Sequence, residues 1–368
     1  MKINSDYFNI FKEPALFVML IIRNALKRKR GAKSNTILIV NVCLIGDFAA
    51  SAPALSAYIG SHLGATIDLL VSPPLQSLAE RMTGVRKVYT ASSVFARELE
   101  QFRSAAQKFD SYEKILALRI SHDAYRVLDT VTTGELQTGF AYFIAYGVHL
   151  MWNLIIGKTP RSWREVNFDM VGAASREVSF EEIFSIPAGD SARIHALSEL
   201  RFEQKKIIIH TGGSWLMNTW GTDKWIELIK KLQKLGDFRF IFVGAKKDER
   251  DYRYISARLP FPTYSLIDRI DILDLVLVLH ASDYFIGVDS GPRNLAHLAG
   301  LPSVTLLGPA PHMFTPPNSN GIVIDRSGGR GLYQRFFRQK NGFIDLITPS
   351  DVCAAFSELL STPRSPND

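Results

Sequence analysis

The stretch Phe285–Gly300, with the sequence FIGVDSGPRNLAHLAG, decides the fold. It opens as an apolar run that is typical of a buried strand, and it breaks at Asp-Ser-Gly-Pro. It closes as a short helix, for which Pro292 suits the first turn and Gly300 suits the end. A strand that passes through a tight turn directly into a helix predicts a parallel α/β sheet.

The rest of the second half repeats this alternation of strand and helix. Each strand is an apolar or β-branched run, and each helix has polar residues on one face. We predict strands at Lys205–His210, Phe238–Gly244, Thr263–Ile267, Tyr284–Asp289 and Ser303–Gly308, and helices at 223–236, 246–260, 272–282, 293–300 and 348–360.

The first half has the same organisation. Strands are expected at Ile37–Cys43, 66–72, Val85–Tyr89 and 112–118, with a small-residue helix at 48–64 and another helix at 74–84. The apolar and aromatic segment Thr133–Ile156 lacks strand alternation, and glycine, histidine and asparagine interrupt it, so we expect a buried or surface-docked helix there. The sequence therefore predicts two doubly wound α/β domains.

Four segments follow from this pattern. We expect a basic amphipathic N-terminal segment at 1–34, a first Rossmann-like domain at 35–190, a second at 191–350, and a C-terminal helix with a tail at 351–368. Length supports two domains, because 368 residues exceed the usual size of one. Only two cysteines occur, which excludes a disulfide framework and a cysteine metal site and fits a reducing cytosol.

Charge gathers at the N-terminus. Residues 1–36 carry eight basic and two acidic residues, which accounts for +6 of the net charge of +7. The apolar run Ala15–Ile22 precedes RNALKRKR; it is too short to span a bilayer and has no cleavage site of a signal peptide. This pattern indicates a segment on an anionic membrane surface, or a surface helix docked on its own protein. No aromatic and basic interleaving points to nucleic acid, so we expect none as a partner.

Three loops after predicted strands carry residues suited to chemistry. In VDSGPRN, Gly291 permits close approach of a ligand, Ser290 supplies a hydroxyl, and the helix start attracts an anion; alternatively, Asp289 or Ser290 only caps the helix. The loop HTGGS at 210–214 offers bare backbone and a hydroxyl, or it is a tight turn beside core tryptophans. Asp47, in LIGDF, is either a general base or an N-cap.

Taken together, the chain resembles glycosyltransferase family 9, the lipopolysaccharide heptosyltransferase group. The resemblance covers residues 35–360 and rests on ILIVNVCLIGDFAASAPAL (37–55), IIIHTGGSWLMNTWGTDKWIELI (207–229) and ASDYFIGVDSGPRNLAHLAGLPSVTLLGPA (281–310). It implies a GT-B fold, in which two Rossmann-like domains face a central cleft. It also implies an inverting transfer of heptose from ADP-heptose, without metal or other cofactor, to a lipid-linked lipopolysaccharide acceptor at the cytoplasmic face of the inner membrane.

The resemblance assigns roles to residues. Asp47 is the general base on the acceptor hydroxyl, and Asp248 binds the ribose of the nucleotide. The other implied donor-binding residues are Thr211, Gly212, Gly213, Ser214, Asn218, Asp289, Ser290, Gly291, Arg293 and Asn294.

Two of these positions depart from the family, which usually has a lysine or arginine in place of Asn218 and a histidine in place of Asn294. Arg293, His297 or Lys224 could supply the missing charge, or the donor is a different nucleotide sugar. The alternative functions are a non-catalytic member that binds a nucleotide sugar or a partner, and a GT-B nucleotide-sugar epimerase. An epimerase requires further carboxylates and a histidine around the donor, which the sequence does not offer at convincing spacing.

Overall fold

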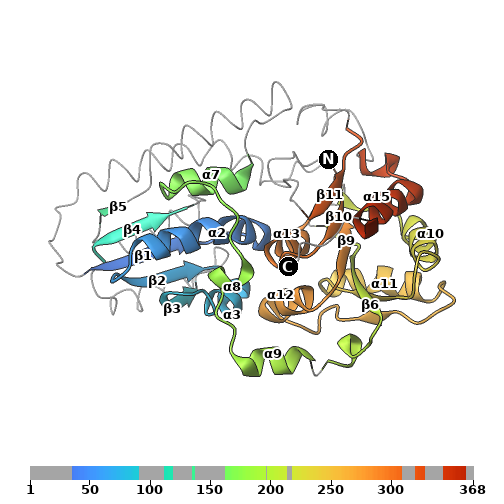
Figure 1. Cartoon of the computed structure of the whole chain (residues 1–368), viewed down its shortest axis with the longest axis horizontal. Helices are drawn as coiled ribbons and strands as arrows, with labels where there is room; N and C mark the ends of the chain where they lie inside the picture. Colours follow the sequence, from blue (N-terminus) through green and yellow to red (C-terminus); the bar gives the residue numbers. More distant parts are fainter. Residues whose placement is uncertain are drawn as a thin grey trace. The chain divides into compact units, whose positions relative to one another are not determined.

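The structure is a computed structural model that describes residues 35–90, 112–118, 135–136, 162–195, 197–213, 218–308, 320–327 and 343–361. These residues form two compact units (Figure 1). The first unit contains the described residues up to 136 together with Arg164–Val178 and Glu182–Ser185, and the chain belongs to the second unit from Ile186 onward. None of the described helices is long and apolar enough to cross a membrane.

The first unit is built on a parallel sheet whose five described strands lie in the order β3-β2-β1-β4-β5 (Figure 1). All residues of the central strand β1 except its first are buried, as expected for a strand that is covered on both faces. The strands are β1 (Thr36–Asn41), β2 (Thr66–Val71), β3 (Val85–Thr90), β4 (Lys114–Ala117) and β5 (Glu135–Leu136).

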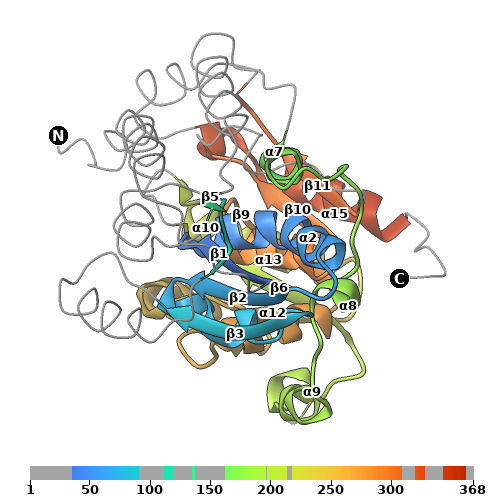
Figure 2. The same cartoon turned by 90° about the vertical axis from the view of Figure 1, so that its left-hand side faces the viewer.

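Helix α2 (Ile45–Ser61) follows β1 and runs alongside this sheet (Figures 1 and 2). Phe48, Ala52 and Leu55 recur at helical spacing and are each 0% exposed, so this stripe faces the core. At the end of β1, Asn41 Nδ2 donates to Ser51 Oγ at 2.8 Å. This buried hydrogen bond holds the beginning of α2 against the end of β1.

Before Ile186, the other elements are short. The helix predicted at 74–84 is only a 3₁₀ turn followed by one helical turn. The helix predicted at Thr133–Ile156 is wrong at Glu135–Leu136, which pair with β4 as the edge strand β5; the rest of that segment lies outside the described residues. The short elements are η1 (Pro73–Leu75), α3 (Gln76–Ala79), α7 (Trp163–Met170) and α8 (Phe180–Ile183).

The second unit contains a six-stranded parallel sheet in the order β11-β10-β9-β6-β7-β8. Counted from β6, this order is 3-2-1-4-5-6, which is the strand order of doubly wound nucleotide-binding sheets. The prediction of a doubly wound second domain is confirmed, with β11 as a strand that the sequence analysis missed. The strands are β6 (Lys205–His210), β7 (Phe238–Phe242), β8 (Tyr264–Ser265), β9 (Tyr284–Val288), β10 (Ser303–Leu306) and β11 (Gly321–Ile324).

Helices cover both faces of the second sheet. In Figure 1, α12 and α13 lie on one face, and α10, α11 and α15 lie on the other. Apolar side chains of β6, β7, β9 and β10 join those of α10 and α15 in one buried cluster. The helices and turns are α9 (Ala188–His195), η2 (Ser198–Leu200), α10 (Thr222–Leu232), η4 (Lys246–Asp248), α11 (Glu249–Ser256), α12 (Ile272–His280), α13 (Gly291–Leu298), η5 (Phe343–Leu346) and α15 (Pro349–Ser361).

Candidate functional site

The crossover point of the second sheet lies between β6 and β9. These strands are neighbours, with His210 paired to Gly287, and the chain builds outward from them in opposite directions. In doubly wound sheets, ligands bind beyond the carboxyl ends of the strands at this point. The loops that leave β6 and β9 are the two that the sequence analysis selected in this half, HTGG and VDSGP. The structure therefore brings these predicted donor residues together.

Ser290 forms the N-cap of α13. Its Oγ accepts a hydrogen bond from Arg293 N at 3.4 Å and donates to Val288 O at 3.0 Å. The capping alternative is thus realised by Ser290, although the long bond is a weak one. Gly291 begins the helix and Pro292 falls in its first turn, as predicted. The positive end of the helix dipole consequently lies at Ser290–Gly291, where it favours an anion.

The loop after β6 is made of glycine because other groups press against it. A Cβ on Gly212 would lie 2.0 Å from Asp248 Oδ1, and one on Gly213 would lie 2.6 Å from Asn218 Cβ. Thr211 is 5% exposed, and Ser214 lies outside the described residues. The two glycines therefore let this backbone pass close to its neighbours, which no larger residue allows.

Asn218 links the two loops. Its Nδ2 donates to Asp289 O at 3.2 Å, and its side chain lies against Gly213. Asn218 is 5% exposed, and its Oδ1 is buried and accepts no hydrogen bond from the described residues. Asn218, where the resemblance leads us to expect a cation, thus holds the loops of β6 and β9 together as a neutral amide.

Asp248 is enclosed by its own loop. It is 6% exposed, and its Oδ2 accepts a hydrogen bond from Ala245 N at 2.9 Å. Gly212 lies on one side of the carboxylate and Gly244 on the other, where a Cβ would come within 2.5 Å of Oδ2. This contact shapes the turn η4, and the role of Asp248 toward a ribose stays a prediction.

His210 is the last residue of β6 and the first residue of the HTGG loop. Its Nδ1 lies 2.9 Å from Val243 O, so Nδ1 carries the proton of the neutral ring, because a carbonyl oxygen only accepts. Burial lowers the pKa of His210 below its ordinary value, which keeps the ring neutral at pH 7. His210 therefore adds no positive charge to the site.

Arg293 lies beneath the loop of β9. It is 1% exposed, and its guanidinium donates to Thr305 Oγ1 at 3.1 Å and to Asn294 Oδ1 at 3.0 Å. Burial lowers its pKa to about 10, opposed by the nearby Asp289, so the group stays charged at neutral pH. Arg293 and Asn294 thus lie in the first turns of α13. The guanidinium of Arg293 is buried against Thr305 of β10, which does not place it for direct contact with a phosphate.

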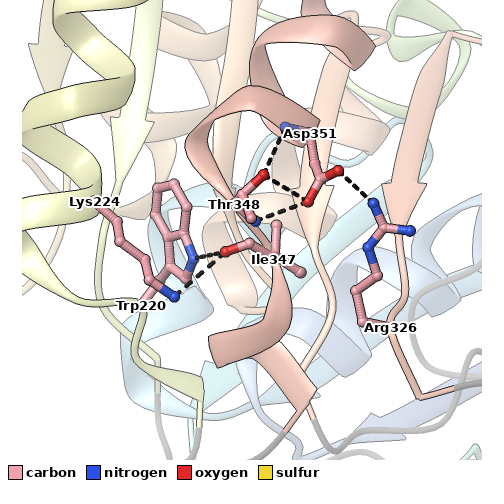
Figure 3. Close-up of polar contacts among 6 residues, drawn as sticks. All are labelled: Trp220, Lys224, Arg326, Ile347, Thr348 and Asp351. Atoms are coloured by element: carbon pink, nitrogen blue, oxygen red, sulfur yellow. Dashed lines mark hydrogen bonds and ion pairs between the residues drawn. The ribbon is translucent and has the colours of Figure 1, made fainter.

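Lys224 is engaged elsewhere in the second unit. Its Nζ donates to Asp345 O at 2.6 Å. It also donates to Ile347 O at 3.4 Å (Figure 3). Trp220 Nε1 donates to the same Ile347 oxygen at 2.9 Å. Lys224 therefore ties α10 to the segment before α15, which leaves it an unsuitable substitute for the cation missing at Asn218.

The sequence analysis overlooked Lys247. It is exposed in the turn η4, just before α11, and its Nζ donates to Gly213 O at 2.6 Å. The two residues are 34 positions apart, so nothing in the local sequence signals the contact. Among the described residues, this lysine brings an exposed ammonium group onto the HTGG loop.

Asp47 belongs to the first unit and lies in the first turn of α2. The N-cap of α2 is Leu44, which makes no side-chain cap bond, so Asp47 is not the N-cap. The helix dipole favours its negative charge at this position. The buried pair Asn41–Ser51, which the sequence analysis also missed, positions the turn that carries Asp47.

Metal ligands do not gather in the part of the chain that the structure describes. No group of three or more His, Cys, Asp or Glu side chains could hold a metal ion there. The backbone amides, the hydroxyl and the helix end at β6 and β9 are instead groups that bind phosphate.

Known proteins share this architecture. The protein is 26% identical over 164 residues to lipopolysaccharide heptosyltransferase 3 of Escherichia coli, which covers 43% of this chain and 47% of that one. The chain thus matches about half the length of this curated relative.

Three solved structures have the same fold. A glycosyltransferase of family 9 from Veillonella parvula has a TM-score of 0.71 at 13% identity, over 90% of this chain and 98% of that one. The ADP-heptose heptosyltransferase II of Escherichia coli has a TM-score of 0.66 at 21% identity, over 88% and 98%. The iron-containing dodecameric glycosyltransferase TibC of Escherichia coli has a TM-score of 0.55 at 12% identity, over 88% and 76%.

These similarities confirm the predicted GT-B fold. The sequence model of glycosyltransferase family 9, described as heptosyltransferase, matches residues 158–341, which is half of the chain and includes every residue of the β6 and β9 loops. The protein therefore belongs to glycosyltransferase family 9, the heptosyltransferase family.

Proposed function

We propose that this protein is an inverting, metal-independent glycosyltransferase. It transfers a sugar, heptose or a similar one, from a nucleotide sugar to a lipid-linked acceptor of lipopolysaccharide or another surface polysaccharide. ADP-heptose is the first candidate for the donor, in line with family membership and with the heptosyltransferase similarities.

One observation carries this proposal. The loops Thr211–Gly213 and Asp289–Gly291 meet at the crossover point of a 3-2-1-4-5-6 sheet, and Asn218 joins them through Asp289 O. A glycine loop and a serine-capped helix start, side by side, suit the diphosphate of a nucleotide sugar.

The proposed reaction gives one role to Asp47 and another to the start of α13. The carboxylate of Asp47 removes the proton of the acceptor hydroxyl, whose oxygen forms the new bond to the anomeric carbon. The bond from that carbon to the diphosphate breaks, and the start of α13 stabilises the charge that develops on the leaving oxygen. A single displacement of this kind inverts the anomeric configuration.

Replacing Asp47 by asparagine tests the catalytic assignment. We expect turnover to fall roughly 10²- to 10⁴-fold, the usual contribution of a general base. Nucleotide affinity should stay near that of the wild type. The melting temperature should fall only slightly, because the substitution is isosteric, Asp47 is not the N-cap of α2, and its charge at the helix start contributes about 0.3–1 kcal/mol. Release of ADP from ADP-heptose with a lipopolysaccharide acceptor is the assay, and undiminished release would exclude Asp47 as the base.

A non-catalytic, nucleotide-sugar-binding role is the second candidate. The observation that favours it is the neutral Asn218 at the centre of the site, together with the commitment of Lys224 to carbonyl oxygens near α15. Under this hypothesis, the protein binds a nucleotide sugar but releases no ADP with any acceptor, and Asp47→Asn changes nothing measurable.

We further propose peripheral attachment to the cytoplasmic face of the inner membrane through residues 1–34, which lie outside the described residues. The segment carries the basic and apolar residues that bind anionic lipid. Sedimentation with vesicles of anionic phosphatidylglycerol should decrease when residues 1–33 are deleted. Equal sedimentation of both proteins would contradict the proposal.

The domain limits remain part of the proposal. We assign 35–190 to the acceptor domain and 191–350 to the donor domain, followed by the helix and tail at 351–368. Helix α15 packs on α10 and β10, so residues up to Ser361 belong to the second unit.

A further inference from the structure

The proposed function requires positive charge at the donor diphosphate, because the leaving group gains negative charge as the glycosidic bond breaks. Among the described residues, three other cations of the second unit are held away from the loop that leaves β6. Lys224 donates to carbonyl oxygens near α15, and Arg293 is buried at the start of α13. The Nζ of Lys246 lies 3.6 Å from Asp268 Oδ2.

Lys247 is placed differently. Its ammonium lies 2.6 Å from Gly213 O, on the loop that leaves β6. Gly213 in turn lies against Asn218, since a Cβ there would come within 2.6 Å of Asn218 Cβ. The charge of Lys247 is therefore presented at the same loop where Asn218 stands without charge.

The turn η4 fixes the backbone from which Lys247 projects. Asp248 accepts the Ala245 N–H at 2.9 Å, and Asp248 N donates to Ala245 O at 2.8 Å. These two bonds close the turn around residues 246 and 247. The exposed side chain keeps its freedom, and its ammonium has three donors, of which Gly213 O takes one.

We propose that Lys247 binds the diphosphate of the nucleotide-sugar donor and supplies the positive charge that Asn218 does not. This inference rests on the proposed function and adds a residue to its site. When the donor binds, Lys247 exchanges the carbonyl oxygen of Gly213 for a phosphate oxygen, which makes a stronger, charge-assisted hydrogen bond. During transfer, it neutralises part of the charge on the leaving diphosphate.

A second observation agrees with this position. Burial is the main reason that the pKa of His210 is lowered; among nearby charges, Asp248 raises this pKa and Lys247 lowers it. The charge of Lys247 thus lies close to the end of β6, in agreement with its contact to Gly213 O.

The test is the variant Lys247→Met, with Lys246→Met as its matched control. Both side chains are exposed and lie one position apart in the same turn, but Lys246 faces Asp268. Calorimetric titration with ADP should show an affinity loss of roughly 10- to 100-fold for Lys247→Met, the effect of losing one hydrogen bond to a charged group. Lys246→Met should stay within about twofold of the wild type, and Lys247→Arg should retain most of the affinity.

Adenosine, which has no phosphate, separates phosphate binding from a general loss of the site. Lys247→Met should bind adenosine as the wild type does, and the salt dependence of ADP binding should become weaker. If Lys247→Met binds ADP as tightly as the wild type, the inference is overturned and the proposed function stands. If the wild type binds none of ADP, UDP and GDP, both are overturned together.

Discussion

Replacing Gly212 by alanine would place a methyl group on the Asp248 carboxylate. The new Cβ would lie 2.0 Å from Oδ1 and 2.6 Å from Cγ, well inside contact distance. The carboxylate has no room to retreat, because Asp248 is 6% exposed and Gly244 lies against its other oxygen. Relief therefore requires that Asp248 give up its hydrogen bond to Ala245 N.

The magnitude follows from these two effects. Overpacking at a buried position costs about 1–3 kcal/mol, and losing a hydrogen bond to a charged group costs about 1.5–3 kcal/mol. Because the two overlap, we expect Gly212→Ala to lower the free energy of unfolding of the second unit by about 3–5 kcal/mol. At about 2–4 °C per kcal/mol for a unit of this size, its melting temperature falls by roughly 6–20 °C.

Differential scanning calorimetry of the purified chain measures this change. Gly189→Ala is the matched control, since a Cβ at Gly189, in helix α9 of the same unit, meets nothing within 4 Å. Alanine is favoured over glycine in a helix by up to about 1 kcal/mol, so the control should melt at the same or a higher temperature. In the double variant Gly212→Ala/Asp248→Ala, the steric conflict disappears. Its loss of unfolding free energy should therefore be smaller than the sum of the losses of the two single variants. A Gly212→Ala protein as stable as the wild type, or strictly additive losses, would refute this reasoning.

Further predictions concern the same unit. The free energy of unfolding should fall as the pH drops below about 6.5. The unfolded chain then binds a proton at His210, whereas the folded chain does not, because burial lowers the pKa of this residue. Urea unfolding at pH 7.5 and 5.5 should therefore show a smaller difference in unfolding free energy between the two pH values for His210→Asn than for the wild type. Thr348→Ala removes the Oγ1 that accepts the Asp351 N–H at 3.1 Å (Figure 3) and should cost about 1 kcal/mol of unfolding free energy, with no change in ADP affinity. Ser290→Ala removes a weak cap bond of 3.4 Å. Expressed as free energies, the loss of ADP binding should therefore exceed the loss of stability that is derived from the melting temperature. The reverse result would make Ser290 a cap alone.

Most strands and helices could be predicted because apolar runs and turn residues that are close together in the sequence determine them. The runs at β1, β6 and β9 are largely apolar, and the segments IGD, TGGS and DSGP follow them, which predicts strands that lead into turns. The strand order could not be predicted, since pairing such as that of β6 with β9 joins residues far apart in the chain. Helix α9 was missed because Ile194 alone among its residues is buried. A single apolar position gives no helical repeat of apolar residues that a sequence analysis could detect.

The candidate site likewise combines residues that a local pattern predicts with contacts between distant residues that it does not. Its glycines, Ser290 and Asp289 stand at the ends of predicted strands, where a loop rule finds them. The links between loops are contacts across 34 and 71 positions, from Lys247 to Gly213 and from Asn218 to Asp289. No local pattern encodes such contacts, and the sequence alone therefore offered Lys224 as a replacement cation when the structure directs it to Ile347 O.

The central claim is that the loops after β6 and β9 hold the diphosphate of a nucleotide sugar. Calorimetric titration of the full chain with ADP, UDP, GDP and ADP-heptose, in the presence of EDTA, tests it most directly. The account predicts that ADP and ADP-heptose bind without metal and more tightly than UDP or GDP. Binding of none of the four would contradict the claim, and binding that appears only after a divalent metal is added would contradict its metal-independence.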